Sequence, residues 1–161
     1  MSTKAPEFTA PSIPTDVRVG IVAARFNADV VDKLLKGCQK RLKELGLTPS
    51  QVELFQVPGA FELPLTAKVM AQTGRFDAII CLGAVIRGET PHFDFVAGEC
   101  ARGVQDVALE TRMPIIFGVL TTDNDEQAWD RTGGKHGHVG IRAAEAAVEM
   151  IAVLKDRKSV V

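Results

Sequence analysis

The sequence has no tyrosine, a single tryptophan and no dense run of basic residues, so it lacks the usual features of a nucleic-acid surface. Its 19 basic residues balance 20 acidic ones, and the net charge of −1 gives no bulk field to attract nucleic acid or lipid. Aromatic residues make up only 6% of the chain, which disfavours a surface that stacks bases. We therefore expect no nucleic-acid partner and no membrane partner.

Cysteine is also scarce. Cys38, Cys81 and Cys100 form no C-x-x-C pair, and all three lie in apolar stretches. Such an odd set predicts buried free thiols in a reducing compartment. The N-terminus lacks the basic-then-apolar pattern of a signal peptide, and no apolar run is long enough to span a bilayer. These observations predict a cytoplasmic protein.

What the sequence does contain is typical of one globular domain: 161 residues, of which 46% are hydrophobic and 24% charged. Residues 1–16 carry three prolines among small and polar residues, which predicts an extended N-terminal arm. We expect a single domain over residues 17–156 and a short C-terminal tail over residues 157–161.

Apolar, β-branched segments alternate with segments in which apolar residues recur at helical spacing. The first kind predicts buried strands over 17–24, 52–58, 76–86 and 113–121. The second predicts helices over 27–45, 59–74 and 91–107, a short helix within 124–132 and a last helix over about 141–154. This alternation predicts a three-layer α/β/α sandwich with a four-stranded parallel sheet, a flavodoxin-like arrangement.

In such a sheet, ligands bind beyond the carboxyl ends of the strands. The segments "ARFN", "PGAFE", "VIRGETPH" and "TTDN" fall at those ends. In the third, Gly88 permits close approach of the backbone, Thr90 can cap the following helix, and Pro91 suits its first turn. A helix start of this kind suits an anion such as phosphate. His92 would lie beside that anion, and the ordinary pKa of a histidine, about 6.5, suits proton transfer.

Each of these residues also fits a purely structural role. Gly-x-Thr-Pro is a common connector, a histidine at a helix start is often solvated, and Arg87 could pair with a neighbouring carboxylate. The chain lacks the glycine fingerprint of dinucleotide sites and the Gly-Lys-Ser/Thr of a P-loop. His136 and His138 have no third ligand nearby in the sequence, so no metal site is predicted.

Taken together, five segments resemble the lumazine synthase family: "ARFN", "VPGAFELP", "LGAVIRGETPHFD", "FGVLTTDNDEQAWDR" and the later "GK…G…A" region. The likeness runs from about Val17 to Leu154. It implies a cofactor-independent transferase of riboflavin biosynthesis that condenses 5-amino-6-(ribitylamino)uracil with 3,4-dihydroxy-2-butanone 4-phosphate. The product would be 6,7-dimethyl-8-ribityllumazine, with phosphate and water released. The resemblance also implies a homopentamer with active sites between subunits, and in some members an icosahedral capsid of twelve pentamers.

The resemblance assigns roles to individual residues. His92 matches the general acid–base, and Phe26 matches the aromatic that stacks on the uracil. Glu62 matches the residue that accepts hydrogen bonds from the ribityl hydroxyls. The remaining matches for uracil and ribityl binding are Gly59, Ala60, Phe61, Ala84, Val85, Ile86 and Phe117. The matches for phosphate binding are Gly88, Glu89, Thr90 and Arg131, with Lys135 near the same end.

Five of these matches need further comment. Phe26 could be a core residue, although its neighbours are polar, and Glu62 could simply favour a helix start. Because a carboxylate repels phosphate, we expect only the backbone N–H of Glu89 to face the anion. Phe117 and Arg131 are expected to come from the neighbouring subunit.

Two other classes of function fit the same scaffold. A flavin- or lumazine-binding carrier would keep Phe26 and Glu62 without needing His92 or Arg131, and a purely structural shell protein would need neither pocket nor phosphate loop. The presence of all four residues favours the enzyme. The short link "TGGKHGHV" resembles that of shell-forming members, although His138 and Val139 depart from the usual pattern.

Overall fold

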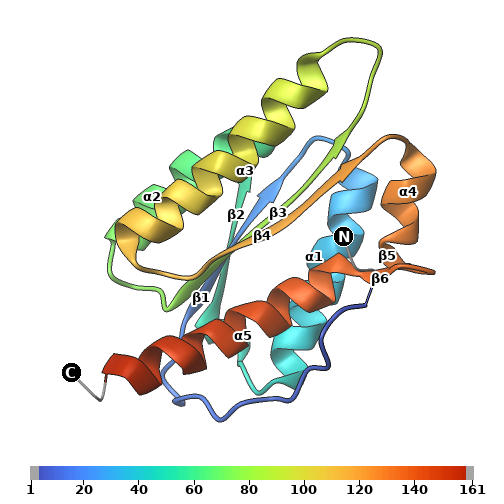
Figure 1. Cartoon of the computed structure of the whole chain (residues 1–161). Helices are drawn as coiled ribbons and strands as arrows, with labels where there is room; N and C mark the ends of the chain where they lie inside the picture. The colour runs from blue at the N-terminus through green and yellow to red at the C-terminus, as the bar shows by residue number, and fades with distance from the viewer. Residues whose placement is uncertain (1–3, 159–161) are drawn as a thin grey trace.

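The computed structural model describes residues 4–158, which form one three-layer α/β/α sandwich (Figure 1). Its central sheet has four strands: β1 (Val19–Ala24), β2 (Val52–Val57), β3 (Ala78–Ile86) and β4 (Ile115–Thr122). The strand order is β2-β1-β3-β4, and every neighbouring pair is parallel. The predicted fold class is confirmed, including the flavodoxin-like order, in which the third strand lies on the far side of the first.

Helices cover both faces of the sheet (Figure 1). On one face lie α2 (Leu63–Gln72) and α3 (His92–Thr111), and on the other lie α1 (Ala28–Glu44) and α5 (Val139–Lys158). The short helix α4 (Asp125–Asp130) follows β4. Two 3-10 turns, η1 (Pro49–Gln51) and η2 (Ala60–Glu62), flank β2. Pro64 lies in the first turn of α2, where a proline costs no hydrogen bond.

The core forms on both faces because β1 and β3 are buried along almost their whole length. Val31, Leu34, Cys38 and Leu42 place the predicted apolar stripe of α1 against one face. Ala97, Cys100, Val104 and Val107 do the same for α3 on the other. Burial of β-branched and aliphatic side chains on both sides is what a parallel sheet requires.

All three cysteines are free and buried, as predicted. Burial raises the pKa of the Cys38 thiol to about 12 and that of Cys100 to about 11. Burial also raises the pKa of Cys81. Because their pKa values are raised, these thiols stay protonated and unreactive at neutral pH. They therefore serve as small apolar core residues.

The chain ends differ from the sheet region. Residues 4–14 form neither helix nor strand, but Ile13 packs against the core, and Gln51 donates hydrogen bonds to the carbonyls of Thr15 and Val17. At the other end α5 continues through residues 157 and 158 of the predicted tail, and residues 159–161 lie outside the described residues. Within residues 4–158, no helix is long and apolar enough to cross a membrane.

The link after α4 is more ordered than its glycine content suggests. Strands β5 (Thr132–Gly134) and β6 (Gly137–His138) pair in an antiparallel hairpin. Gly133 and Gly137 adopt positive φ angles of 113° and 81°, which glycine allows at little cost. We call residues 131–138 the basic hairpin, because Arg131 lies at its foot and Lys135 at its turn.

Candidate functional site

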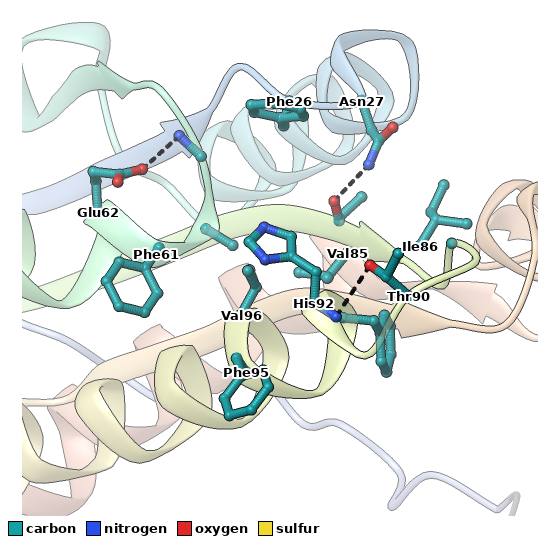
Figure 2. A pocket seen from close by; sticks show the side chains of 15 residues that line it. Phe26, Asn27, Phe61, Glu62, Val85, Ile86, Thr90, His92, Phe95 and Val96 are labelled. Atoms are coloured by element: carbon teal, nitrogen blue, oxygen red, sulfur yellow. Dashed lines mark hydrogen bonds between the residues drawn. The ribbon is translucent and has the colours of Figure 1, made fainter.

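The segments that follow β1, β2 and β3 converge on one cavity of about 650 Å³ at the carboxyl edge of the sheet (Figure 2). A volume of this order suits a small-molecule ligand. Eleven of the predicted site residues line it, namely Phe26, Gly59, Ala60, Phe61, Glu62, Ala84, Val85, Ile86, Gly88, Thr90 and His92. The cavity also contains Asn27, Phe93, Phe95 and Val96, which the sequence patterns do not assign to a site.

Phe26 is held just after β1 because backbone hydrogen bonds to the neighbouring chain segment continue beyond the end of the strand. The N–H of Arg25 donates to the Val57 carbonyl at 2.9 Å, and that of Phe26 donates to the Pro58 carbonyl at 3.1 Å. The Phe26 side chain is 73% exposed, so it is not a core phenylalanine. An exposed ring on a fixed backbone offers a π-face to a flat ligand.

Asn27 is a residue type that could cap α1, and it does lie at the N-cap position, but its side chain does not cap the helix. The residue is in the left-handed region, with φ 54° and ψ 48°, and makes no side-chain cap bond. Its Nδ2 instead donates to the carbonyl oxygen of Ala84 at 2.8 Å. Asparagine tolerates this backbone conformation better than most residues. The side chain thereby ties the end of β1 to β3 across the floor of the cavity.

Glu62 lies in the 3-10 turn that leads into α2. One of its carboxylate oxygens, Oε2, accepts a hydrogen bond from the Gly59 N–H at 2.9 Å. A carboxylate has about four lone-pair positions, so most of its accepting capacity stays free for a ligand. In Figure 2, Phe26 lies above the His92 imidazole and Glu62 lies to the left of it.

The segment between β3 and α3 ends in a helix start that lies one residue later than predicted, because Pro91 rather than Thr90 occupies the N-cap position and no side chain caps the helix there. Helix α3 has 20 residues and begins at His92, and the His92 N–H donates to the Thr90 hydroxyl oxygen at 3.4 Å. His92 is exposed, and its ring lies in the middle of the cavity (Figure 2). A long helix that begins here directs its positive dipole end and free N–H groups toward the cavity. The Glu89 side chain is exposed and does not line the cavity.

Arg87 lies outside the cavity and stabilises the segment between β3 and α3. Its guanidinium donates to Asp123 and to Asp94, each at 3.2 Å, and lies over the Phe93 ring at 4.2 Å. The hydrogen bond to Asp123, followed by the charge of Asp94, raises the pKa of Arg87 above its ordinary value. The structural role considered for Arg87, pairing with neighbouring carboxylates, is therefore confirmed.

Three predicted site residues lie elsewhere in the chain. Phe117 lies on β4 with 40% of its surface exposed and does not line the cavity. Arg131 and Lys135 line a second, open cavity of about 740 Å³ with Trp129, Asp130 and other residues after β4. Among residues 4–158, no group of three or more histidine, cysteine, aspartate or glutamate side chains is arranged to hold a metal ion.

The sequence of this sandwich matches a protein family. Residues 16–155 match the model described as 6,7-dimethyl-8-ribityllumazine synthase. The chain belongs to the 6,7-dimethyl-8-ribityllumazine synthase family. Because the match covers almost the whole sandwich, all segments that line the two cavities fall within the part shared with the family.

Membership in the lumazine synthase family implies a transferase, and it agrees with the resemblance carried by the five sequence segments. Among the cavity residues that the sequence patterns did not assign to a site, Phe95 is the one whose position in the sequence most clearly indicates an exposed role. It lies off the apolar stripe of α3 and is 68% exposed, whereas a core phenylalanine would lie on the stripe. Phe93 and Val96 gave no such signal, because they share the stripe that packs α3 on the sheet.

Proposed function

We propose that the chain condenses 5-amino-6-(ribitylamino)uracil with 3,4-dihydroxy-2-butanone 4-phosphate to form 6,7-dimethyl-8-ribityllumazine, phosphate and water. The observation that carries this proposal is the composition of the first cavity. It combines an exposed aromatic face, a carboxylate and a histidine at a helix start within about 650 Å³. No simple carrier or shell protein needs all three together.

The uracil would occupy the part of the cavity between Phe26 and the end of β3. Its flat, electron-rich ring would stack on the Phe26 face, while Ala84, Val85 and Ile86 border it. Glu62 would accept hydrogen bonds from the ribityl hydroxyls through the lone pairs that Gly59 leaves free. Gly59 and Ala60 are buried beside it and allow the ribityl group to pass close to the backbone.

The phosphate of the second substrate would bind at the start of α3. Gly88 and Thr90 line that end of the cavity, and the backbone N–H of Glu89 would join them while its side chain stays in water. The helix dipole and free N–H groups favour an anion there. This arrangement holds the reactive ketone carbon of the butanone phosphate near His92.

The reaction needs little covalent help from the protein. The uracil amine attacks the ketone to form a Schiff base with loss of one water, and proton removal then expels phosphate. A second condensation closes the ring with loss of a second water. His92 would accept and return protons, a contribution of about 10²–10⁴-fold in rate. Holding both substrates in one orientation would supply most of the remaining acceleration. Because bond formation takes place between the substrates, we propose that no cofactor takes part.

We further propose that each site is completed by a neighbouring subunit of a homopentamer. Phe117, Arg131 and Lys135 do not line the first cavity of their own chain, and each is wholly or partly accessible. A second copy could bring an Arg131 guanidinium to the phosphate, where it would form charge-assisted hydrogen bonds. A cyclic pentamer joins two different faces at every interface, which fits a site split in this way.

We also propose a hollow particle of sixty subunits and a cytoplasmic location. The link between α4 and α5 is a compact hairpin with no insertion, which supports close packing of pentamers, and the three buried thiols suit a reducing compartment. Light scattering tests the assembly. A particle of pentamer size would contradict the shell and leave the pentamer standing.

The decisive assay is to mix the purified protein with both substrates and follow lumazine fluorescence. We expect product to form only when both substrates are present, with one phosphate released per lumazine. Binding of lumazine without turnover would favour a carrier, and neither binding nor turnover would favour a structural shell protein.

A further inference from the structure

The imidazole of His138 occupies a space that two glycines leave between α1 and α5. A Cβ placed on Gly37 of α1 would lie 2.2 Å from Cε1 and 2.4 Å from Nε2 of His138. A Cβ on Gly140 of α5 would lie 2.1 Å from the backbone oxygen of Leu34 in α1 and 3.0 Å from Cε1 of the same ring. We call this space the glycine socket of Gly37 and Gly140. Any side chain at Gly37 would push the ring out.

Within the socket the ring caps a helix. Nδ1 of His138 accepts a hydrogen bond from the backbone N–H of Ile141 at 3.3 Å. Helix α5 begins at Val139, so this N–H is one of the first-turn donors that no helical carbonyl can satisfy. Because Ile141 is the donor, Nδ1 must carry a lone pair, and the ring is neutral with its proton on Nε2.

The capping ring also lies at the base of the basic hairpin. His138 pairs with Thr132 across the hairpin, and the N–H of Val139 donates to the Arg131 carbonyl at 2.9 Å. At the turn, the Lys135 N–H donates to Asp130 Oδ1 at 2.6 Å. Figure 1 shows the hairpin beside α4 at the start of α5. Arg131 and Lys135 therefore belong to the same hairpin whose base His138 occupies.

The charged side chains that act on the ring, within the described part of the chain, are both cations. Lys33 from α1 and Arg142 from α5 disfavour its protonated form. From β5 the ring faces Gly133, on which a Cβ would lie 3.6 Å from Cδ2. Burial is the largest cause that lowers the pKa of His138, while hydrogen bonding with the Lys33 backbone acts in the opposite direction. A proton on Nδ1 would face the Ile141 N–H, so two donors would meet, and it would place a positive charge at a helix N-terminus.

We propose that His138 is a positioning residue that holds Arg131 and Lys135 in their binding arrangement, and that protonation of its ring in acid releases the basic hairpin. The effect on phosphate rests on the proposed function, but the effect on the hairpin does not. A lowered pKa means that the folded chain favours the neutral ring. The neutral His138 ring therefore contributes its full stabilisation above the ordinary histidine pKa of about 6.5. This contribution is lost as the pH falls through the lower pKa that the ring has in the folded chain.

Hydrogen exchange measured by mass spectrometry on the full chain tests the structural part. Peptides that cover residues 131–142 should lose protection by about fivefold between about pH 7.5 and pH 5.5, after correction for intrinsic rates, because a helix cap is lost. His138→Asn should change by less than about twofold, because asparagine caps helices without titrating. His138→Ala should be about fivefold less protected at both pH values.

The matched control is His136→Asn, which changes the other histidine of the hairpin. His136 contacts Asp130 and does not cap α5, so this variant should keep the wild-type pH response. If wild-type protection does not respond to pH, or His138→Asn responds as strongly, the proposal is wrong. If His136→Asn abolishes the response, the titrating residue is His136 and the proposal is equally wrong. These comparisons do not need His138→Ala to fold.

Kinetics test the positioning role. At about pH 5.5 the KM for the butanone phosphate should be about fivefold higher in wild type than in His138→Asn, whereas the two should agree within about twofold at pH 7.5. Comparing variants at one pH cancels the ionisation of the substrate phosphate. The KM for the uracil should be the same in both. Equal KM values for the phosphate at both pH values would overturn the positioning role. Absence of any turnover would instead refute the proposed function, and the exchange result would stand.

Discussion

The two cavities lie at the same edge of one sheet, yet they are built in opposite ways. The first is apolar and aromatic, and its residues come from three strand ends that β1 and β3 bring together. The second is open and polar, and its residues come from one stretch of chain after β4. The first is the more enclosed and contains a helix start, but no lysine or arginine is among the described residues that line it. The second is more open, and Arg131 and Lys135 line it.

Under the proposed function, this difference is the reason to expect that one chain alone does not complete the phosphate site. Amide groups and a helix dipole orient an anion, but tight binding of a phosphate usually adds cations that form charge-assisted bonds. Here the orienting groups and the cations lie in separate cavities. The exposed rings of Phe26, Phe61 and Phe95 likewise leave apolar surface that a ligand or another subunit would cover. Both observations favour a site between copies of the chain.

The largest effect is expected from the first cavity. His92→Ala should lower kcat by about 10²–10⁴-fold, with a smaller change in either KM, because proton transfer slows while substrate positioning persists. Steady-state fluorescence assays with both substrates measure it. His136→Ala is the comparison for kcat alone: that histidine lines the second cavity and not the first, so kcat should stay near the wild-type value even if the phosphate KM changes. A His92→Ala enzyme with near-normal kcat would show that the ring binds substrate but does not move protons.

The next effect tests the second cavity. Arg131→Ala should raise the KM for the butanone phosphate by about 10- to 150-fold, which corresponds to the loss of a charge-assisted bond worth about 1.5–3 kcal/mol. The KM for the uracil should change much less. Arg142→Ala is a matched control, because Arg142 lies close to the hairpin and donates to the His136 carbonyl without lining the second cavity. A rise in the uracil KM alone would place Arg131 at the wrong substrate.

Mixing these two variants tests whether the cavities meet across an interface. In a random pentamer of His92→Ala and Arg131→Ala chains, about a quarter of the interfaces join an intact His92 face to an intact Arg131 face, because each interface pairs two different faces. At a butanone phosphate concentration well below the wild-type KM, where both parent pentamers have little activity, co-refolded protein should therefore recover about a quarter of the wild-type rate. Verified mixed pentamers no more active than the average of the two parents would place both residues in one subunit's site.

Much of the first cavity could be predicted from sequence because its geometry follows from topology. In a parallel sheet the carboxyl ends of neighbouring strands lie together, so three segments far apart in sequence had to converge. The predicted segment "VIRGETPH" forms the expected strand-to-helix connection, although α3 begins at His92 rather than at Pro91. Buried strands and helical stripes are strong periodic signals, and they placed every element of the central sandwich.

The rest could not be predicted because it depends on side-chain packing between elements. Asparagine is a residue type that commonly caps helices. The side chain of Asn27 instead donates to the carbonyl oxygen of Ala84, because the fold brings β3 close to it. The β5–β6 hairpin is too short to give a periodic signal. His138 has the sequence context of a loop histidine. Its capping role requires Gly37, about a hundred residues away, to leave room on α1.

The smallest effect on activity is expected from Gly37→Ala, which tests the packing behind the second cavity. Alanine normally stabilises a helix interior by about 1 kcal/mol relative to glycine. Here the new methyl group would lie 2.2 Å from Cε1 of His138, so the ring must move. We expect a net loss of about 1–3 kcal/mol in the free energy of unfolding, as for an overpacked core. The phosphate KM should rise about fivefold, and the uracil KM should stay unchanged.

A double-mutant cycle with His138→Asn separates this clash from other effects of the methyl group. Asparagine has no atoms at the positions of Cε1 and Nε2, so the closest contacts of the new methyl group disappear. In that background Gly37→Ala should cost much less, or stabilise α1 by up to about 1 kcal/mol. Denaturant unfolding at a fixed protomer concentration measures all four proteins. If Gly37→Ala costs the same in both backgrounds, the ring is not held by the glycine socket. The second cavity would then owe its shape to the Asp130 contacts at the turn rather than to the helix cap.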